Sequence, residues 1–113
     1  FGTIKERVGF LGLKQMDAYH AVRDGVRYPA VLLTTGMTDP RVEPWQVAKM
    51  AARLQAAVMA LQRADRNPVL LRVDIDAGHG LGSTRQQIDA ERADEFAFVL
   101  WRSGTPRFQP KAT

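Results

Sequence analysis

The sequence of 113 residues contains no cysteine, only two serines and no long apolar run. Without cysteine the chain has no disulfide, no thiol nucleophile and no Cys-ligated metal site, and the redox compartment stays undetermined. Because no stretch of eighteen apolar residues exists, we expect no membrane-spanning helix and no membrane partner. Residues 1–3 show neither an initiator Met nor a signal-peptide pattern, so we expect a piece of a longer polypeptide of undetermined localisation.

Long runs of like charge are also missing, although the net charge is +4. Arginines alternate with acids, as in residues 85–92, and no stretch holds five like charges. Nucleic-acid binding normally needs a clustered basic face, so we expect no nucleic-acid partner. The hydrophobic content of 45% is ordinary for one globular domain that buries a core.

Apolar periodicity in the first part of the chain predicts a helix and then a strand. The helix is expected over residues 3–17, with a capping box formed by Thr3 and Glu6. Residues 30–35 are a continuous apolar run, which is typical of a strand buried on both faces. Gly36 ends that strand.

The next part of the chain predicts a second helix and a second strand. The helix begins at Pro44, because the first helical turn accepts proline, and Asn67-Pro68 stops it. The strand covers residues 69–75. Its Arg72 and Asp74 share one side, which indicates a position near the edge of a sheet.

A final helix is expected from about Thr84 to Arg102, with Ser83 as its N-cap. Gly104 and Pro106 terminate it. The full order is helix, strand, helix, strand, helix, and two parallel strands joined by a helix make a right-handed βαβ unit. Parallel strands need neighbours on both sides, so we expect either a missing N-terminal part of the domain or self-association into a homo-oligomer.

Two polar side chains follow the ends of the two strands. Asp39 comes shortly after the first strand, and His79 lies between two glycines after the second. Because adjacent strands lie about 4.8 Å apart, the two loops can bring carboxylate and imidazole within hydrogen-bond reach. A carboxylate in that position holds the imidazole in one tautomer and stabilises the imidazolium. Two simpler interpretations stay open, since Asp-Pro is ordinary turn chemistry and a loop histidine can bond to backbone alone.

Other candidate sites are weaker. Residues 78–83 look like a glycine-rich phosphate loop, but the G-x-G-x-x-G pattern fails at Ser83. His20 and His79 lack partners at metal-ligand spacing, so we expect no metal and no cofactor. Tyr19 and His20 are expected to pack against the sheet, and Trp45 and Trp101 to be core or interface aromatics.

The strongest signal is a pair of spaced motifs. The run Pro29 to Gly36 followed by Asp39-Pro40-Arg41-Val42-Glu43-Pro44, and the run Asp74 to Gly82 around His79, closely resemble the end of the catalytic domain of prolyl oligopeptidases. The resemblance extends from Phe1 through the helix that contains Trp101. It implies an α/β class, as a C-terminal fragment of an α/β-hydrolase fold of order α-β-α-β-α with two parallel strands. Residues 1–104 would form this partial domain and residues 105–113 a flexible tail.

The resemblance also implies roles for three residues. Asp39 would orient the histidine, His79 would act as general base and acid, and Arg41 would bind a backbone carbonyl of the substrate. A guanidinium suits that task because it is permanently charged and offers a fork of donors. The intact enzyme would cut short proline-containing peptides after proline through an acyl-enzyme.

One departure from that family concerns the nucleophile. The Ser-Asp-His order of α/β-hydrolases begins with a Gly-x-Ser-x-Gly elbow, and this chain has only Ser83 and Ser103, neither on an elbow. We therefore expect the chain to be inactive alone. The alternative is a free-standing, truncated, non-catalytic domain that self-associates or serves as an interaction module.

Overall fold

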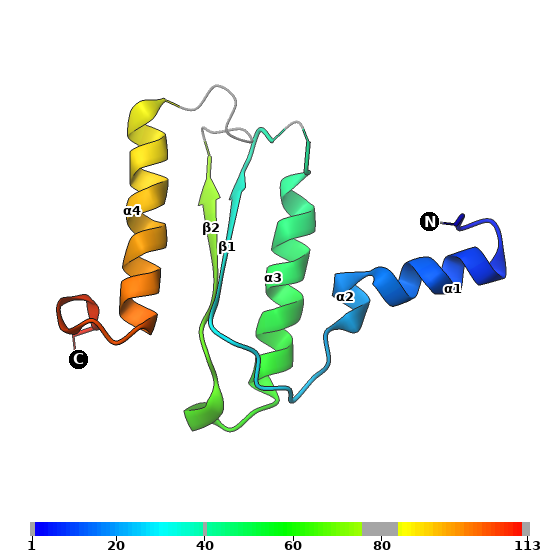
Figure 1. Cartoon of the computed structure of the whole chain (residues 1–113), viewed down its shortest axis with the longest axis horizontal. Coiled ribbons are helices and arrows are strands. Elements are labelled where there is room, and N and C mark those ends of the chain that lie inside the picture. Colours follow the sequence, from blue (N-terminus) through cyan, green and yellow to red (C-terminus); the bar gives the residue numbers. More distant parts are fainter. Residues whose placement is uncertain (1, 40, 76–83, 112–113) are drawn as a thin grey trace.

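The two apolar runs pair as a parallel two-stranded sheet, made of β1 (Val31–Gly36) and β2 (Val69–Asp74). The structure is a computed structural model that describes residues 2–39, 41–75 and 84–111. The register places Val31 opposite Val69 and Gly36 opposite Asp74. Both strands therefore end at the same edge of the sheet, as the expected βαβ unit requires (Figure 1).

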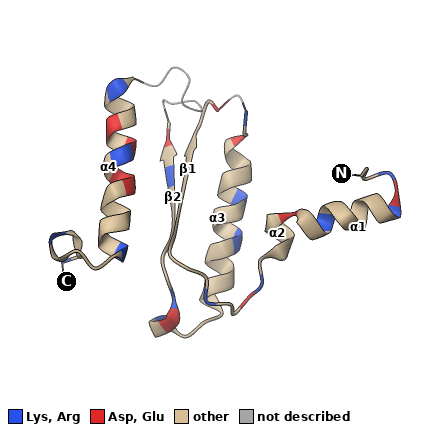
Figure 2. Ribbon diagram, viewed as in Figure 1, with Lys and Arg blue, Asp and Glu red and all other residues tan. Residues whose placement is uncertain are grey.

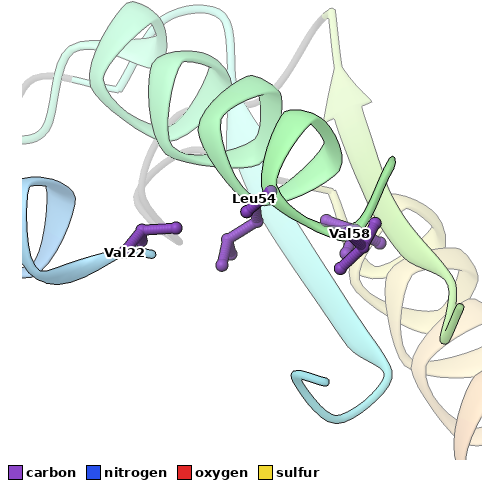
Figure 3. Close-up of a cluster of buried hydrophobic side chains, with 5 residues drawn as sticks. Val22, Leu54 and Val58 are labelled. Carbon is purple, nitrogen blue, oxygen red and sulfur yellow. The ribbon is translucent and has the colours of Figure 1, made fainter. Parts of the chain in front are cut away.

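One face of the sheet packs against α3 (Pro44–Met59), whose apolar residues recur at helical spacing. The buried side chains come from this helix, from β2 and from the segment before β1: Val22, Ala51, Leu54, Ala57, Val58 and Val69. Figure 3 shows Leu54 and Val58 on the helix, with Val22 beside them from the preceding segment. This small cluster is the core that holds the βαβ unit together.

The predicted end of α3 was wrong, because the helix stops at Met59 rather than continuing toward Asn67. The guanidinium of Arg66 donates to the carbonyl oxygens of Met59 and Leu61 at 2.8 and 2.9 Å. These bonds satisfy carbonyls that a helix end leaves without partners. A short 3₁₀ helix, η1 (Arg63–Asp65), then leads to β2.

The other face of the sheet is turned toward α4 (Arg85–Arg102), so the layers run helix, sheet, helix (Figure 1). Its N-cap is Thr84, not Ser83 as predicted. The Thr84 hydroxyl accepts from the amide of Gln87 at 3.3 Å, and Gln87 Oε1 accepts from the amide of Thr84 at 2.7 Å. This reciprocal capping box fixes where α4 starts.

A groove of about 890 Å³ separates α4 from the sheet. Its apolar lining includes Leu32, Leu70, Phe98 and Trp101, and the last two rings meet edge to face. Residues 106–108 of the expected tail form the 3₁₀ helix η2 (Pro106–Phe108), and Gln109 donates to the Trp101 carbonyl at 3.1 Å. The helix thus lies over the sheet without close packing along its length.

The first helix is shorter than predicted: α1 is Arg7–Met16, and the expected Thr3–Glu6 capping box does not form. Glu6 is the N-cap without a side-chain bond, while the Thr3 hydroxyl accepts from the Lys5 amide at 3.2 Å. The backbone of Thr3 lies very close to Gly9. A Cβ atom on residue 9 would be only 2.5 Å from the Thr3 carbonyl oxygen. Residues 2–6 therefore fold back along the helix instead of extending it.

A four-residue helix, α2 (Ala18–Ala21), links α1 to the rest of the chain. Asp17 caps it by accepting from the Tyr19 amide at 3.0 Å and also pairs with His20. His20 is exposed, and the Tyr19 ring lies under Lys49 Nζ of α3 at 4.4 Å. The prediction that both pack against the sheet was wrong, because α2 lies beside α3 instead (Figure 1).

Acidic and basic side chains are mixed along α4, whereas the charged side chains of α1 and α3 are all basic (Figure 2). Within the ranges that the structure describes, no helix combines the length and the apolar character needed to cross a membrane.

Candidate functional site

The loop after β1 is built at the carboxyl edge of the sheet. Beyond the last ladder pair, the amide of Met37 still donates to the carbonyl of Asp74 at 2.9 Å, which keeps the two chains together. The amide of Asp39 then donates back to the carbonyl of buried Gly36 at 3.3 Å. This turn places Asp39, half-buried, directly over the edge where β2 also ends.

The carboxylate of Asp39 is oriented by the backbone that follows it. Its Oδ1 accepts from the amide of Arg41 at 2.8 Å and from the amide of Val42 at 3.1 Å. Such bonds from a side chain to the following backbone amides are typical of aspartate in a turn. Asp39 therefore has the turn role that the sequence also allowed. The same two bonds also do what an orienting carboxylate needs, because they hold the group in one rotamer.

Arg41 contributes its amide to this arrangement, while the residue as a whole is exposed. Pro44 follows at the first turn of α3 and ends the loop. Trp45, expected as a core or interface aromatic, has 57% of its surface exposed, and its indole N–H donates to the Glu43 carboxylate. An exposed arginine and an exposed tryptophan thus follow Asp39 along the chain.

His79 lies outside the described residues, as does Ser83. The pairing of Asp39 with His79 accordingly stays a prediction. The structure does place the chain on both sides of that segment: Asp74 ends β2 opposite Gly36, and Thr84 caps α4.

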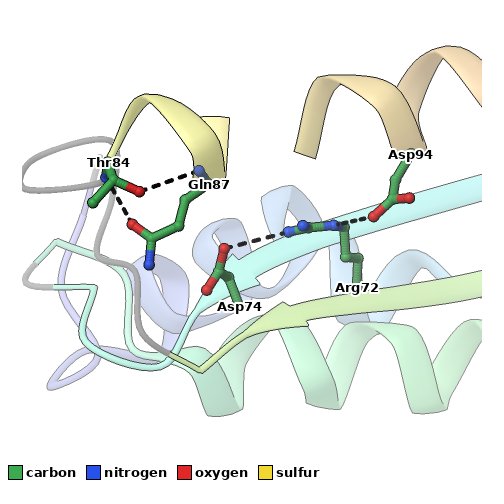
Figure 4. A network of polar contacts seen from close by, with 5 residues as sticks. All are labelled: Arg72, Asp74, Thr84, Gln87 and Asp94. Carbon is green, nitrogen blue, oxygen red and sulfur yellow. Dashed lines mark hydrogen bonds and ion pairs between the residues drawn. The ribbon is translucent and has the colours of Figure 1, made fainter. Parts of the chain in front are cut away.

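An ion-pair network joins β2 to α4. Arg72 Nε donates to Asp94 Oδ2 on α4 at 2.7 Å, and Arg72 Nη1 lies 3.7 Å from Asp74 Oδ2 (Figure 4). The hydrogen bond to Asp94 raises the pKa of Arg72 above its ordinary value, with smaller contributions from the charges of Glu91 and Asp74. The guanidinium is thus fully charged and shared between strand and helix.

The sequence predicted that Arg72 and Asp74 lie on the same side of the second strand. The distance of 3.7 Å between their charged groups confirms this. The sequence interpretation missed Asp94, Thr84 and Gln87. The capping box was readable as Thr-x-x-Gln before a helical pattern. The Arg72–Asp94 pair was not readable, because it depends on the rotation of α4 about its axis.

Ser103 ends α4 at the opposite end from Thr84. Its hydroxyl donates to the carbonyl of Leu100 at 3.1 Å and lies 3.3 Å from the Thr105 hydroxyl. Among the described residues, no group of three His, Cys, Asp or Glu side chains could hold a metal ion.

Comparison with known proteins gives this arrangement a family. The sequence pattern of the prolyl oligopeptidase family matches residues 2–105. The chain is 36% identical over 105 residues to a prolyl endopeptidase of Elizabethkingia miricola, which covers 92% of this chain and 14% of the relative. It is 39% identical over 77 residues to dipeptidyl aminopeptidase BI of Pseudoxanthomonas mexicana, covering 68% of this chain and 10% of the relative. It is 38% identical over 84 residues to prolyl oligopeptidase A of Galerina marginata, covering 69% of this chain and 11% of the relative.

The chain thus spans 14% or less of the length of these relatives. The match runs through β1, the Asp39 loop, α3, β2 and α4, and two parallel strands with helices on both faces fit part of an α/β-hydrolase domain. The chain belongs to the prolyl oligopeptidase family.

Proposed function

We propose that this chain supplies the general base and its orienting carboxylate to a serine peptidase site. His79 takes the proton of a serine hydroxyl, and Asp39 holds the imidazole and stabilises the imidazolium. The observation that carries the proposal is the fixed carboxylate of Asp39 at the edge where Gly36 and Asp74 are paired. His79 follows Asp74 by only five residues.

The serine itself comes from outside these 113 residues. Ser103 is at the far end of α4 from Thr84 and its hydroxyl donates to a backbone carbonyl, which supports excluding it as the nucleophile. No Gly-x-Ser-x-Gly elbow occurs in the sequence. Alone, the chain should not form an acyl-enzyme.

The substrate class is a peptide cut after proline. Relatives named as prolyl endopeptidase and prolyl oligopeptidase motivate that class. The exposed Arg41 donates to a backbone carbonyl of the peptide on the acyl side of the cut. Its amide is committed to Asp39, so its side chain can serve substrate without disturbing the carboxylate.

A chimera tests this function. The matching 105-residue region of the Elizabethkingia miricola prolyl endopeptidase is replaced by this chain. We expect the chimera to hydrolyse a fluorogenic proline peptide, and His79→Ala or Asp39→Ala to reduce kcat by about 10³-fold or more. Arg41→Met should mainly raise KM. A His79→Ala chimera with full activity would refute the assignment.

The inactivity of the isolated chain has its own test, which is labelling with a fluorophosphonate directed at activated serines. We expect no labelling of the 113-residue chain, with the chimera as the positive control. Labelling of the isolated chain at Ser83 or Ser103 would show that it carries its own nucleophile.

A specific observation favours the second candidate, a self-associating module. The chain exposes 8779 Å², whereas a compact monomer of its mass exposes about 6,200 Å². Its radius of gyration is 17.2 Å against about 13 Å for a compact domain of this length. Large apolar side chains such as Val8, Phe96 and Val99 are more than half exposed.

This excess surface is large enough for a stable interface, because such an interface buries roughly 1,200–2,000 Å² summed over both partners. Within the described residues β1 pairs with β2 alone. The other edge of β1 can therefore form backbone hydrogen bonds with a strand of another chain. Sedimentation velocity at increasing concentration should show association of the isolated chain. A monodisperse monomer with cooperative unfolding would argue against this second function.

A further inference from the structure

A second hollow, of about 480 Å³, lies between α1 and the segment that contains α2, at residues that the proposed peptidase function does not use (Figure 1). It is lined by Leu11, Lys14, Gln15, His20, Ala21 and Arg23. Among these described lining residues three carry basic groups and none carries an acid. The hollow therefore offers positive charge and several hydrogen-bond donors to a ligand.

The polar side of α1 is the side that faces this hollow. Lys14 and Gln15, near the end of the helix, line it. Val8 and Met16 do not line it and are 83% and 61% exposed. A surface helix ordinarily turns its apolar side inward and its polar side to water. Because α1 does the reverse here, the space beside α2 suits a polar ligand better than apolar packing.

Lys14 and Arg23 are cations without a carboxylate of their own. Both residues are exposed, and among the described residues neither side chain is in an ion pair. The backbone amide of Arg23 donates to the Tyr28 hydroxyl at 2.9 Å, which holds the main chain at this position and leaves the guanidinium free. Arg53, by contrast, is already bonded to Asp24 at 2.6 Å. Lys14 and Arg23 can therefore bind an anion without first losing a partner.

His20 adds a third group from α2. Its Nδ1 bonds to Asp17, which lines the adjoining hollow beside Tyr19 and Lys49 rather than this one. That bond and an edge-to-face contact with the Tyr19 ring, at 5.6 Å between centroids, orient the imidazole. With Nδ1 engaged, Nε2 is the ring nitrogen left for a ligand, and it donates when the ring is protonated.

We propose that this hollow binds the phosphate group of a small organic phosphate monoester. Lys14, His20 and Arg23 come from three successive parts of the chain, so their donors can reach separate oxygens. A phosphate group presents three strong acceptor oxygens, whereas the two oxygens of a carboxylate are satisfied by one bidentate arginine. The volume is within the roughly 300–1,000 Å³ of small-molecule sites, and Leu11 and Ala21 provide apolar lining for the organic part.

The test is an NMR titration of the full 113-residue chain, in which backbone amide signals are followed as phenyl phosphate or inorganic phosphate is added. Ionic strength is kept constant, because salt screens exposed charges. We expect saturable shifts among the amides of residues 11–23, and tighter binding of phenyl phosphate than of inorganic phosphate. Benzoate, which has the same ring and a carboxylate, should bind at least about tenfold more weakly.

Variants of the two unpaired cations should weaken binding. Lys14→Gln and Arg23→Gln should each raise the Kd for phenyl phosphate about fivefold or more, and the double variant by more than either. Arg27→Gln is the matched control. It removes the same charge from an exposed arginine four residues along the chain that does not line the hollow, and it should change the Kd by less than about twofold.

Each other result would overturn the proposal. Shifts that grow without saturation, or equal losses in Arg23→Gln and Arg27→Gln, would show attraction to a basic surface only. Benzoate bound as tightly as phenyl phosphate would exclude a phosphate site, and shifts confined to the loop around Arg41 would place the ligand elsewhere. Circular dichroism checks that each variant folds. Should Arg23→Gln unfold, Lys14→Gln decides, with Lys5→Gln, an exposed lysine outside the hollow, as its control.

Discussion

Asn67 and Arg102 are 35 residues apart in the sequence, yet Arg102 Nη2 donates to Asn67 Oδ1 at 3.1 Å. The side-chain amide nitrogen of the same asparagine, Nδ2, donates to the backbone carbonyl of Tyr28 at 2.8 Å. One side chain thus joins the approach to β1, the approach to β2 and the end of α4. The residue expected only as a helix stop is a connection among three segments.

Replacing this connector should cost stability. Asn67→Ala removes both bonds and leaves the half-buried Tyr28 carbonyl without its donor, for which we expect a loss of about 1–2 kcal/mol in the free energy of unfolding. Urea unfolding followed by circular dichroism measures it. Gln62→Ala, at an exposed position nearby, is the control and should change stability by less than about 0.5 kcal/mol.

Leu54 should be the most sensitive apolar position of α3. It is 6% exposed in a core of only a few side chains, so Leu54→Ala should cost about 2–4 kcal/mol. Met59→Ala, on the same helix but 60% exposed, should cost far less. Equal losses in the two variants would mean that the cluster around Leu54 is not the core.

The start of α4 should depend on the Thr84 hydroxyl. Thr84→Ala removes the acceptor for the Gln87 amide and should lower the free energy of unfolding by about 1 kcal/mol. Thr84→Ser keeps an oxygen in the same place and should stay close to the parent chain. Thermal unfolding of the three proteins side by side checks the order; a Ser variant as weak as the Ala variant would contradict a capping role.

Acid should weaken the connection between α1 and the rest of the chain. The hydrogen bond from His20, with that from the Tyr19 amide, lowers the pKa of Asp17 below its ordinary value of 3.8. A lowered folded-state pKa means that the stabilisation is fully present above the ordinary value and is lost as the pH falls through the lower one. Unfolding free energies of the parent and Asp17→Asn should therefore converge below about pH 4, and a constant difference down to pH 2 would contradict this.

The parts of the fold that the sequence predicted correctly are those carried by local pattern. The strands appear within one residue of their expected bounds, because continuous apolar runs beside turn residues leave little choice. Helix ends were less predictable. The end of α3 depends on Arg66 reaching back to two carbonyls, and the start of α1 on how closely residue 3 approaches Gly9.

The candidate site divides in the same way. The place of Asp39 just after β1 could be predicted because it depends on local sequence, whereas its role as the orienting carboxylate stays a prediction. Asp94 was missed because its partner Arg72 lies 22 residues earlier, and no spacing rule links a strand residue to one side of a helix that stands off from the sheet.

Both amides that orient Asp39 belong to the main chain of Arg41 and Val42. The carboxylate is consequently indifferent to which side chains occupy those two positions, provided that neither is proline, which has no amide hydrogen to donate. Under the proposed function, the side chain at position 41 can then be varied without disturbing the orientation of the carboxylate. We thus predict that substitutions at position 41 change substrate binding while the bonds that orient Asp39 persist.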